Sequence, residues 1–302
     1  MSRLRSLLRR TAYALVGILV LLVAVGFFLP SSARVERNRV EGLAELRVAD
    51  RGNGIHLFDG TGLRVIGNTV TGARDGIYVS ATEDSLIADN RTDHLRYGIH
   101  YMYSHRNTLR GNRASHDTGG IALMESRELV VEGNVATHNR NFGILFRTAQ
   151  RCRIVGNRLT DNGQGMFFYS STENVIADNR IVHNDIGAKV WGGSTRNEVR
   201  GNAFIGNRQQ VFYVGASDLV WGQGGRGNLW SDYIGWDQDG DGVGELPYRL
   251  DSFTAVLIHR YPGAVLLLRS PALELLAHLE RQLPLLRVPT LVDRAPLLGR
   301  AG

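Results

Sequence analysis

The side chains best suited to metal chemistry lie between residues 100 and 124. They are two histidines and two methionines: His100, Met102, His105 and Met124. Imidazole and thioether groups together suit Cu(I), a soft ion that prefers such ligands. Stacked methionines also serve as hydrophobic filler in protein cores. We therefore treat the four residues as a candidate copper site, with simple packing as the alternative.

A second candidate metal site is the acidic loop from residue 237 to residue 245. Its acids occupy loop positions 1, 3, 5 and 9, a glycine occupies position 6 and a carbonyl oxygen is available at position 7, as in an EF-hand calcium loop. Position 12 is Tyr248, so the usual bidentate glutamate is missing. The expected calcium ligands are Asp237, Asp239, Asp241, Val243 and Glu245. A solvated Asp-Gly turn that caps the fold is the alternative.

These residues lie on, or just after, a repeat of about 22 residues. An asparagine preceded by Gly or Asp recurs every 22 or 23 residues, and a glycine followed by an apolar residue recurs in phase with it. The asparagines are Asn68, Asn90, Asn112, Asn134, Asn157, Asn179 and Asn202. The glycines are Gly54, Gly76, Gly98, Gly120, Gly143, Gly165 and Gly187. Units this short cannot bury their own apolar faces, so they must stack as coils of a solenoid.

Each unit holds short alternating segments rich in Val, Ile and aromatic residues, with no room for a helical stripe. The fold class is therefore all-β, and we predict a right-handed parallel β-helix over residues 35–230. The predicted domain, residues 34–250, also includes the acidic loop. The asparagine row is expected at a coil corner, where stacked amides satisfy the backbone of the turns.

The alternation after each repeat glycine separates the core from the surface. The first and third residues after the glycine are apolar in almost every unit, so they should line the core. The second and fourth residues face outward, yet they are aromatic, His and Met rather than Ser, Thr or charged. Such a strip predicts a surface for docking a partner, unless a loop or the C-terminal tail covers it. The residues chosen for this docking strip are Tyr78, Phe167, Tyr169 and Trp191.

A column of histidines forms a further pattern in the repeat. Four residues after successive asparagines stand His94, His116, His138, Asp161 and His183. Imidazoles about 4.8 Å apart could share a metal, although this spacing is wider than a shared ligand set usually needs. Exposed polar positions beside a turn are the alternative.

The two ends of the chain differ in character from the repeat. Four arginines precede an apolar run from Thr11 to Leu29, so residues 1–33 are expected to be a secretory signal or a retained membrane anchor. Both predictions place the remaining residues outside the cytoplasm. In the tail, residues 251–302, the pair Ser270-Pro271 and the leucine spacing that follows predict a short amphipathic helix. The tail is expected either to cap the β-helix or to dock on a partner.

The charge and the cysteine content of the chain argue against nucleic-acid binding and against a disulfide. The formal net charge is +6, but four of the arginines lie in residues 1–33, which contain no acid and leave +2 for the rest of the chain. A nearly neutral domain without basic blocks is not expected to bind nucleic acid. The single cysteine, Cys152, rules out an intramolecular disulfide.

Several segments together resemble NosD, the family of periplasmic maturation proteins for nitrous oxide reductase. The segments are Arg51 to Ile55, the run Tyr97-Gly-Ile-His-Tyr-Met-Tyr-Ser104, Gly227 to Tyr233 with the acidic loop that follows, and the tail around 266–272 and 293–298. The ladder of Asn and Gly is shared with many β-helix proteins, whereas the His-Tyr-Met-Tyr run and the tail are more specific. Family members usually have further coils before the region that starts near Arg34.

The resemblance implies an exported accessory protein that is not an enzyme. Its implied partners are an ABC transporter with its permease and ATPase, a copper chaperone lipoprotein, and the reductase whose copper–sulfur centre is assembled. The face with His100, Met102 and Met124 would then meet the chaperone or the reductase, and the tail would meet the transporter. The alternative is a carbohydrate-binding or carbohydrate-active β-helix. Against it, the outward strip carries no acid, whereas a glycoside hydrolase needs a pair of carboxyl groups.

Overall fold

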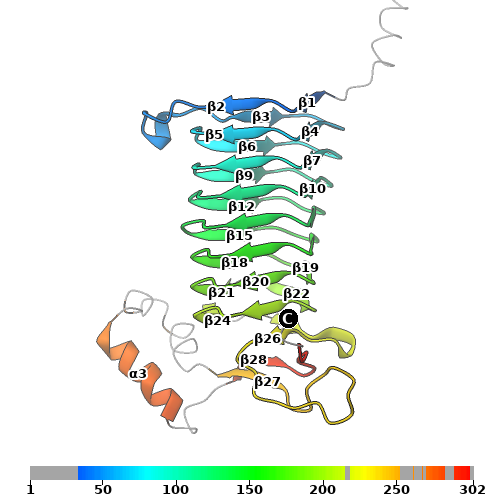
Figure 1. Ribbon diagram of the computed structural model, residues 1–302, viewed down its shortest axis with the longest axis vertical. Coiled ribbons are helices and arrows are strands. Elements are labelled where there is room, and N and C mark those ends of the chain that lie inside the picture. Colours follow the sequence, from blue (N-terminus) through cyan, green and yellow to red (C-terminus); the bar gives the residue numbers. More distant parts are fainter. Residues whose placement is uncertain are drawn as a thin grey trace, which may run out of the picture.

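The computed structural model describes residues 33–214, 218–251, 261, 267, 270–282 and 289–299. Over these residues the chain forms a parallel β-solenoid whose coils stack along one axis (Figure 1). Successive coils add strands to three parallel sheets, called sheets A, B and C. The predicted all-β class and the parallel solenoid are thereby confirmed.

The strands are short because each coil must turn three corners in about 22 residues. Sheet A contains β1 (Arg34–Glu36), β4 (Arg64–Ile66), β7 (Leu86–Ala88), β10 (Thr108–Arg110), β13 (Val130–Glu132), β16 (Arg153–Val155), β19 (Val175–Ala177), β22 (Thr195–Arg200) and β25 (Asp218–Trp221). Sheet B contains β2 (Arg39–Glu41), β5 (Thr69–Thr71), β8 (Arg91–Asp93), β11 (Arg113–Ser115), β14 (Val135–Thr137), β17 (Arg158–Thr160), β20 (Arg180–Val182), β23 (Ala203–Ile205) and β26 (Leu229–Trp230). Sheet C contains β3 (Ile55–Phe58), β6 (Asp75–Ser80), β9 (Tyr97–Met102), β12 (Gly119–Met124), β15 (Phe142–Arg147), β18 (Gln164–Tyr169), β21 (Ile186–Trp191) and β24 (Gln209–Val214). Two 3-10 turns, η1 (Val48–Asp50) and η2 (Gln223–Gly225), lie near the two ends of the solenoid.

The asparagine row forms a buried hydrogen-bond ladder at one corner, as predicted. In each step the backbone N–H and the side-chain Nδ2 of one asparagine donate to Oδ1 of the asparagine one coil later, as from Asn112 to Asn134 at 2.9 Å each. The ladder runs from Asn38 to Asn228. The residue before each asparagine of the repeat has a positive φ, such as 64° at Gly111, which explains why that residue is Gly or Asp.

The core is filled by the two inward rows of sheet C together with residues of sheets A and B. Ile77, Ile121 and Ile144 from the first row are fully buried, as are Leu123 and Phe146 from the second. Full burial of such side chains stabilises the fold by about 1.5–3 kcal/mol each. Cys152 is also buried, and burial raises the pKa of its thiol to about 11. The thiol is therefore part of the packing rather than a reactive group.

The C-terminal end of the ladder is closed by the tail of the chain. Strand β28 (Pro289–Asp293) pairs antiparallel with β27 (Tyr248–Asp251), and its last residue is the fully buried Asp293. The Oδ2 atom of Asp293 accepts hydrogen bonds from N and Nδ2 of Asn228 at 2.7 and 3.1 Å, and from Nε1 of Trp230 at 3.0 Å. Asp293 thus takes the place of the next asparagine in the ladder.

The expected helix of the tail is α3 (Pro271–Gln282). The Ser270 hydroxyl accepts a hydrogen bond from the backbone N–H of Leu273 at 3.4 Å, as an N-cap residue does. The tail is not a helical unit, however, because residues 289–293 return as a strand and Leu297 bridges to Leu229 and Val243. The apolar segment at residues 11–29 lies outside the described residues. Within the described part of the chain, no helix is long and apolar enough to cross a membrane.

Candidate functional site

Three of the four candidate copper ligands lie together on the outer face of sheet C. Strand β9 carries His100 and Met102, and the neighbouring strand β12 carries Met124. Met102 and Met124 are paired in register, so their Cα atoms are about 4.8 Å apart. His100 and Met102 are two residues apart on one strand and therefore point to the same side of the sheet.

His100 is held by a buried carboxylate that the sequence pattern did not reveal. Its Nδ1 atom lies 2.9 Å from Oδ2 of Asp75, and both side chains are buried. The guanidinium of Arg96 binds the same carboxylate through Nε at 2.8 Å and Nη2 at 2.5 Å. Although burial alone would raise the pKa of Asp75, the hydrogen bonds from His100 and Arg96 lower it overall. Asp75 is therefore an anion at neutral pH.

This arrangement leaves the other ring nitrogen of His100 available as a ligand. In the neutral ring, a carboxylate beside Nδ1 favours the proton on that nitrogen, which leaves the lone pair on Nε2. Nε2 of His100 is buried and has no hydrogen-bond partner among the described residues. A histidine bound to a metal commonly donates its second ring N–H to a carboxylate in this way.

The two methionines lie in a small apolar cluster on the outer face. Met124 is buried with Ala122, Phe142 and Leu145, and Met102 packs against this group. The rings of Tyr97 and Phe142 stack at 5.8 Å over Gly119, where an added Cβ would lie 2.4 Å from Phe142. Glycine is needed at residue 119 because the two rings close over that point.

The centre of the outward strip is therefore not exposed, contrary to the prediction. His100 is 6% exposed, Ala122 is fully buried and Met124 is 5% exposed. Tyr78 and Tyr97 pack against the His100 ring, with centroids 4.8 and 5.0 Å from it, and Phe142 packs with Ala122 and Met124. A position that points out of the solenoid is still buried when the neighbouring coils carry large aromatic side chains.

His105 lies apart from the other three candidate ligands along the coil. It follows the end of β9 and pairs with Glu83 and Arg127 in a row of single bridges. Its Nδ1 atom is buried without a partner among the described residues. Burial and the nearby Arg127 lower the pKa of His105, so its imidazole is neutral near pH 7.

The four residues of the predicted docking strip fall into two groups. Phe167, Tyr169 and Trp191 form one aromatic cluster, with ring centroids 6.4–6.5 Å apart. The ammonium of Lys189 lies 5.0 Å from the ring of Phe167 and 5.3 Å from that of Trp191. Tyr78 belongs instead to a stack with the rings of His56 and His100, each at 4.8 Å. Tyr169 is 41% exposed, so the first group is accessible from solvent.

The acidic loop brings three of its five predicted ligands together. Carboxylate oxygens of Asp237, Asp239 and Asp241 lie within 4.8 Å of one another. Asp237 accepts hydrogen bonds from the backbone N–H of Gly240 at 2.7 Å and of Gly242 at 2.9 Å, and these bonds lower its pKa. The ends of the loop are also linked, because Oε1 of Glu245 accepts the backbone N–H of Gln238 at 3.4 Å. The backbone beside Val243 is held by the tail, through Gly244 N to Pro296 O at 2.8 Å.

Comparisons with known proteins agree with the resemblance seen in the sequence. The family model described as "Periplasmic copper-binding protein (NosD)" matches residues 34–235. Two curated relatives are both named "Probable ABC transporter binding protein NosD": the one from Pseudomonas aeruginosa is 44% identical and the one from Stutzerimonas stutzeri 38% identical, each over 85 residues. Each alignment covers 28% of this chain and 20% of the relative, so the match spans about a fifth of the relatives' length.

Among solved structures, the crystal structure of the periplasmic alginate epimerase AlgG is 18% identical, with a TM-score of 0.46. This match covers 59% of the present chain and 40% of the epimerase. The family match takes in strands of all three sheets of the solenoid and ends just before the acidic loop. Since it spans more than half of the chain, the protein belongs to the NosD family of periplasmic copper-binding proteins.

Proposed function

We propose that this protein is a periplasmic accessory factor that carries copper during the maturation of nitrous oxide reductase. The observation that carries the proposal is the buried His100 ring, with Asp75 on one nitrogen and the other nitrogen unpartnered among the described residues. The family description as copper-binding and the relatives' names as ABC transporter binding proteins support it. The role is transfer and assembly rather than catalytic turnover.

The proposed copper ligands are Nε2 of His100 and the thioether sulfurs of Met102 and Met124, with His105 as a further candidate. Cu(I) favours neutral, soft ligands, and the surrounding rings of Tyr97 and Phe142 keep the site apolar. Asp75 would orient the His100 ring without binding the metal. The bound ion would supply no chemistry of its own here, because it is the cargo.

Copper binding can be tested by anaerobic Cu(I) titration of the purified full-length protein against a chromophoric chelator. Met102→Leu, Met124→Leu and His100→Gln are each expected to weaken binding at least about tenfold. Met166→Leu is the matched control, because Met166 points into the core and should not change the affinity. Wild-type affinity in all three outer-face variants would contradict the proposed site.

The biological role is tested separately in a strain that lacks this protein. The reductase is expected to be exported but to lack its copper–sulfur centre, and fully loaded reductase from that strain would exclude the role. The carbohydrate alternative makes a different prediction, namely release of reducing or unsaturated sugar ends from a polysaccharide panel by the purified protein.

The proposed docking surface for the copper chaperone lipoprotein or the reductase is the aromatic cluster of Phe167, Tyr169 and Trp191, with Tyr78, four coils away, as a separate contact. The transporter would contact the tail, and residues 11–29 would hold the protein at the inner membrane if they are retained. Tyr169→Ala is expected to reduce capture of the purified chaperone while leaving Cu(I) affinity unchanged. Equal capture by the variant and the wild type would remove this surface from the proposal.

The acidic loop is proposed to bind calcium and to stabilise the C-terminal end of the solenoid. The convergence of Asp237, Asp239 and Asp241 supports this assignment. Calcium is expected to raise the thermal unfolding midpoint of the wild type, and Asp239→Asn to weaken calcium binding about tenfold by removing one ligand charge. Asp59→Asn, a change at an exposed corner on another coil, is the control. A calcium response that survives in Asp239→Asn would argue against the site.

A further inference from the structure

We infer that Asp93, His94 and His116 form a third metal site, for a divalent ion of borderline softness such as Zn²⁺. The site lies at the edge of sheet B and uses none of the proposed copper or calcium ligands. It is therefore independent of the copper-carrying role. The inference rests on three observations: the stacking of the histidines, the position of Asp93 between two of them, and the pocket beside that carboxylate.

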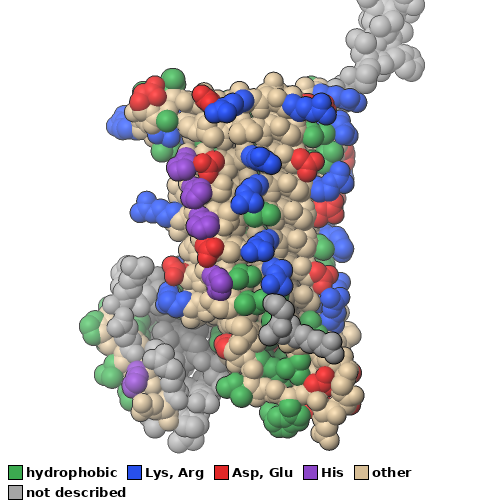
Figure 2. Space-filling model, in the orientation of Figure 1, with side chains coloured by type: hydrophobic (Ala, Val, Ile, Leu, Met, Phe, Trp, Pro, Cys, Tyr) green, Lys and Arg blue, Asp and Glu red, His purple; other side chains and the backbone are tan. Residues whose placement is uncertain are grey.

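The histidines form a column along the solenoid, interrupted by one acidic side chain (Figure 2). The rings of His94 and His116 stack at 5.2 Å, and those of His116 and His138 at 5.4 Å. All three residues have φ between 53° and 58°, so each occupies the same left-handed corner of its coil. The corner fixes the side-chain direction, and the coils therefore present the imidazoles in register.

Asp93 distinguishes one coil of this column from the others. Asp93 is the last residue of β8. The residues in register with it on the next two coils are Ser115 and Thr137, which are not acidic. The Oδ2 atom of Asp93 lies 2.5 Å from Nδ1 of His94, and its Oδ1 lies 2.8 Å from Nδ1 of His116. The carboxylate is thus already placed between two imidazoles, and ligand atoms of all three residues lie within 4.8 Å of one another.

The carboxylate of Asp93 is held in position for a cation. Besides its contacts with the two imidazoles, its Oδ1 accepts a hydrogen bond from the Ser115 hydroxyl at 2.9 Å. A divalent ion would replace the protons that these imidazoles now direct at the carboxylate. The side chains of His94 and His116 are 71% and 51% exposed, so small ring rotations can bring the donors to about 2.0–2.2 Å from one centre.

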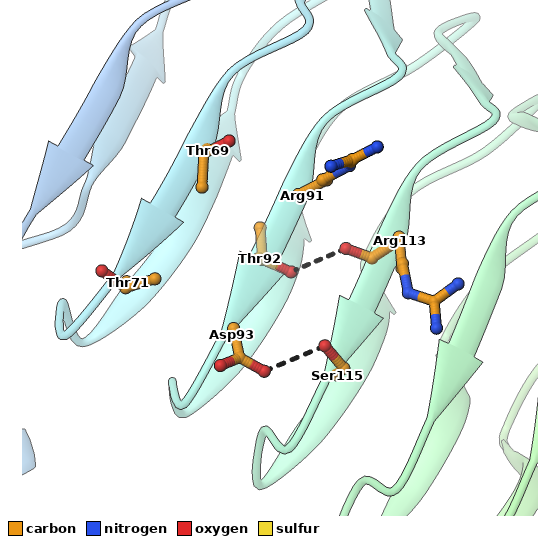
Figure 3. A pocket seen from close by; sticks show the side chains of 7 residues that line it. All are labelled: Thr69, Thr71, Arg91, Thr92, Asp93, Arg113 and Ser115. Atoms are coloured by element: carbon orange, nitrogen blue, oxygen red, sulfur yellow. Dashed lines mark hydrogen bonds between the residues drawn. The ribbon is translucent and has the colours of Figure 1, made fainter.

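The donor set points to the class of ion. Two imidazoles and a carboxylate are the three protein ligands of many open zinc sites, and they include no sulfur to favour Cu(I). A fourth position would remain open. Asp93 also lines a pocket of about 520 Å³, together with Arg91 and Arg113 (Figure 3). The pocket leaves room for a water molecule as the fourth ligand.

The experiment is calorimetric titration of the full-length protein with Zn²⁺, in excess Ca²⁺ to occupy the acidic loop. His94→Ala and His116→Ala are each expected to weaken Zn²⁺ binding at least about tenfold. His183→Ala is the matched control, because His183 occupies the same corner of a later coil at φ 53° but has no acid at the corresponding place on its strand. Co²⁺ provides a second readout, since a four-coordinate site absorbs strongly in the visible range and His116→Ala should abolish that band.

Loss of both signals in the His94 and His116 variants, with His183→Ala unchanged, would support the site. Equal weakening by His183→Ala would overturn it, because the column would then bind metal without any defined centre. Unchanged Zn²⁺ affinity in His116→Ala would overturn it as well. Far-UV circular dichroism checks that the variants are folded, which is expected for exposed side chains.

Discussion

Replacement of Asp293 by alanine is expected to lower the free energy of unfolding by about 3–9 kcal/mol. Asp293 accepts hydrogen bonds from two donors of Asn228 and from Trp230, and all three residues are buried. Alanine would leave those three donors unpaired, and each buried donor without a partner costs about 1–3 kcal/mol. Urea unfolding followed by tryptophan fluorescence measures the change, because Trp230 lies at the affected end.

Asp293→Asn is the matched control for this prediction. The amide oxygen can still accept the two hydrogen bonds of Asn228, as each ladder asparagine does for its neighbour, so most of the stability should be retained. If Asp293→Ala unfolded at the wild-type urea concentration, the tail would not be the cap of the ladder. A loss of similar size in Asp293→Asn would show that the negative charge, rather than the acceptor, is what matters.

Asp117→Asn is expected to stabilise the protein by a few kcal/mol at pH 8 and to have little effect at pH 4. Asp117 is the first member of a second ladder, which continues through Asn139 to Asn207. Its Oδ1 accepts the backbone N–H of Leu95 at 2.8 Å, as an asparagine would. Its Oδ2, which stands in place of a donor Nδ2, is buried without a partner in the described part of the chain.

The pH dependence follows from the pKa of this carboxyl group. Burial, aided by the charge of Asp93, raises the pKa of Asp117 from 3.8 to about 8, against the hydrogen bond from Leu95. The folded state therefore holds a proton that the unfolded state has lost between about pH 4 and pH 8. Stability falls as the pH rises through this window, by up to about 1.4 kcal/mol per pH unit.

Asparagine carries no titrating proton, so Asp117→Asn should escape that loss. The difference in unfolding free energy between the variant and the wild type, measured at pH 4, 6 and 8, removes the contribution of all other groups. A difference that grows with pH is the expected result. A constant difference would mean that Asp117 ionises normally in the folded protein.

The coil architecture could be predicted because each coil of the repeat requires the same two residue types at one corner. The ladder needs a buried amide at one corner, and the left-handed residue before it needs Gly or Asp, so the two markers recur in sequence at the period of the coils. The inward rows could be predicted for a related reason, since alternation along β6, β9 and β12 separates the core side from the outer side.

The Asp75–Arg96–His100 set could not be predicted from the same pattern. Asp75 stands immediately before a repeat glycine, in a row whose other members, such as Tyr97 and Phe142, have no common chemistry. A usable signal did exist. Once β6 and β9 are paired in parallel register, an acid before one glycine must lie beside the coil that carries His100.

Two other features depend on packing or on distant contacts. The outer strip was expected to be exposed at its centre, but Ala122 is buried there. The rings of Tyr97 and Phe142 pack in the cluster that includes Ala122, and they can do so only because Gly119 has no side chain. The cap contact of Asp293 joins it to Asn228, 65 residues earlier. No repeat spacing connects two positions so far apart, so the sequence suggested a cap without identifying the residue that makes it.

The closing contact of Asp293 also has a consequence for the order of chain synthesis. Coils made early can stack on one another as the chain grows, because each ladder step needs only the coil that follows it. The last step needs Asp293, which is made long after Asn228. Until then the growing solenoid carries an open strand edge at its newest coil, a template for pairing with other chains. A chain that stops short of residues 289–298 would carry a nearly complete ladder but leave the buried donors of Asn228 and Trp230 without their acceptor, and we expect it to be more prone to aggregation.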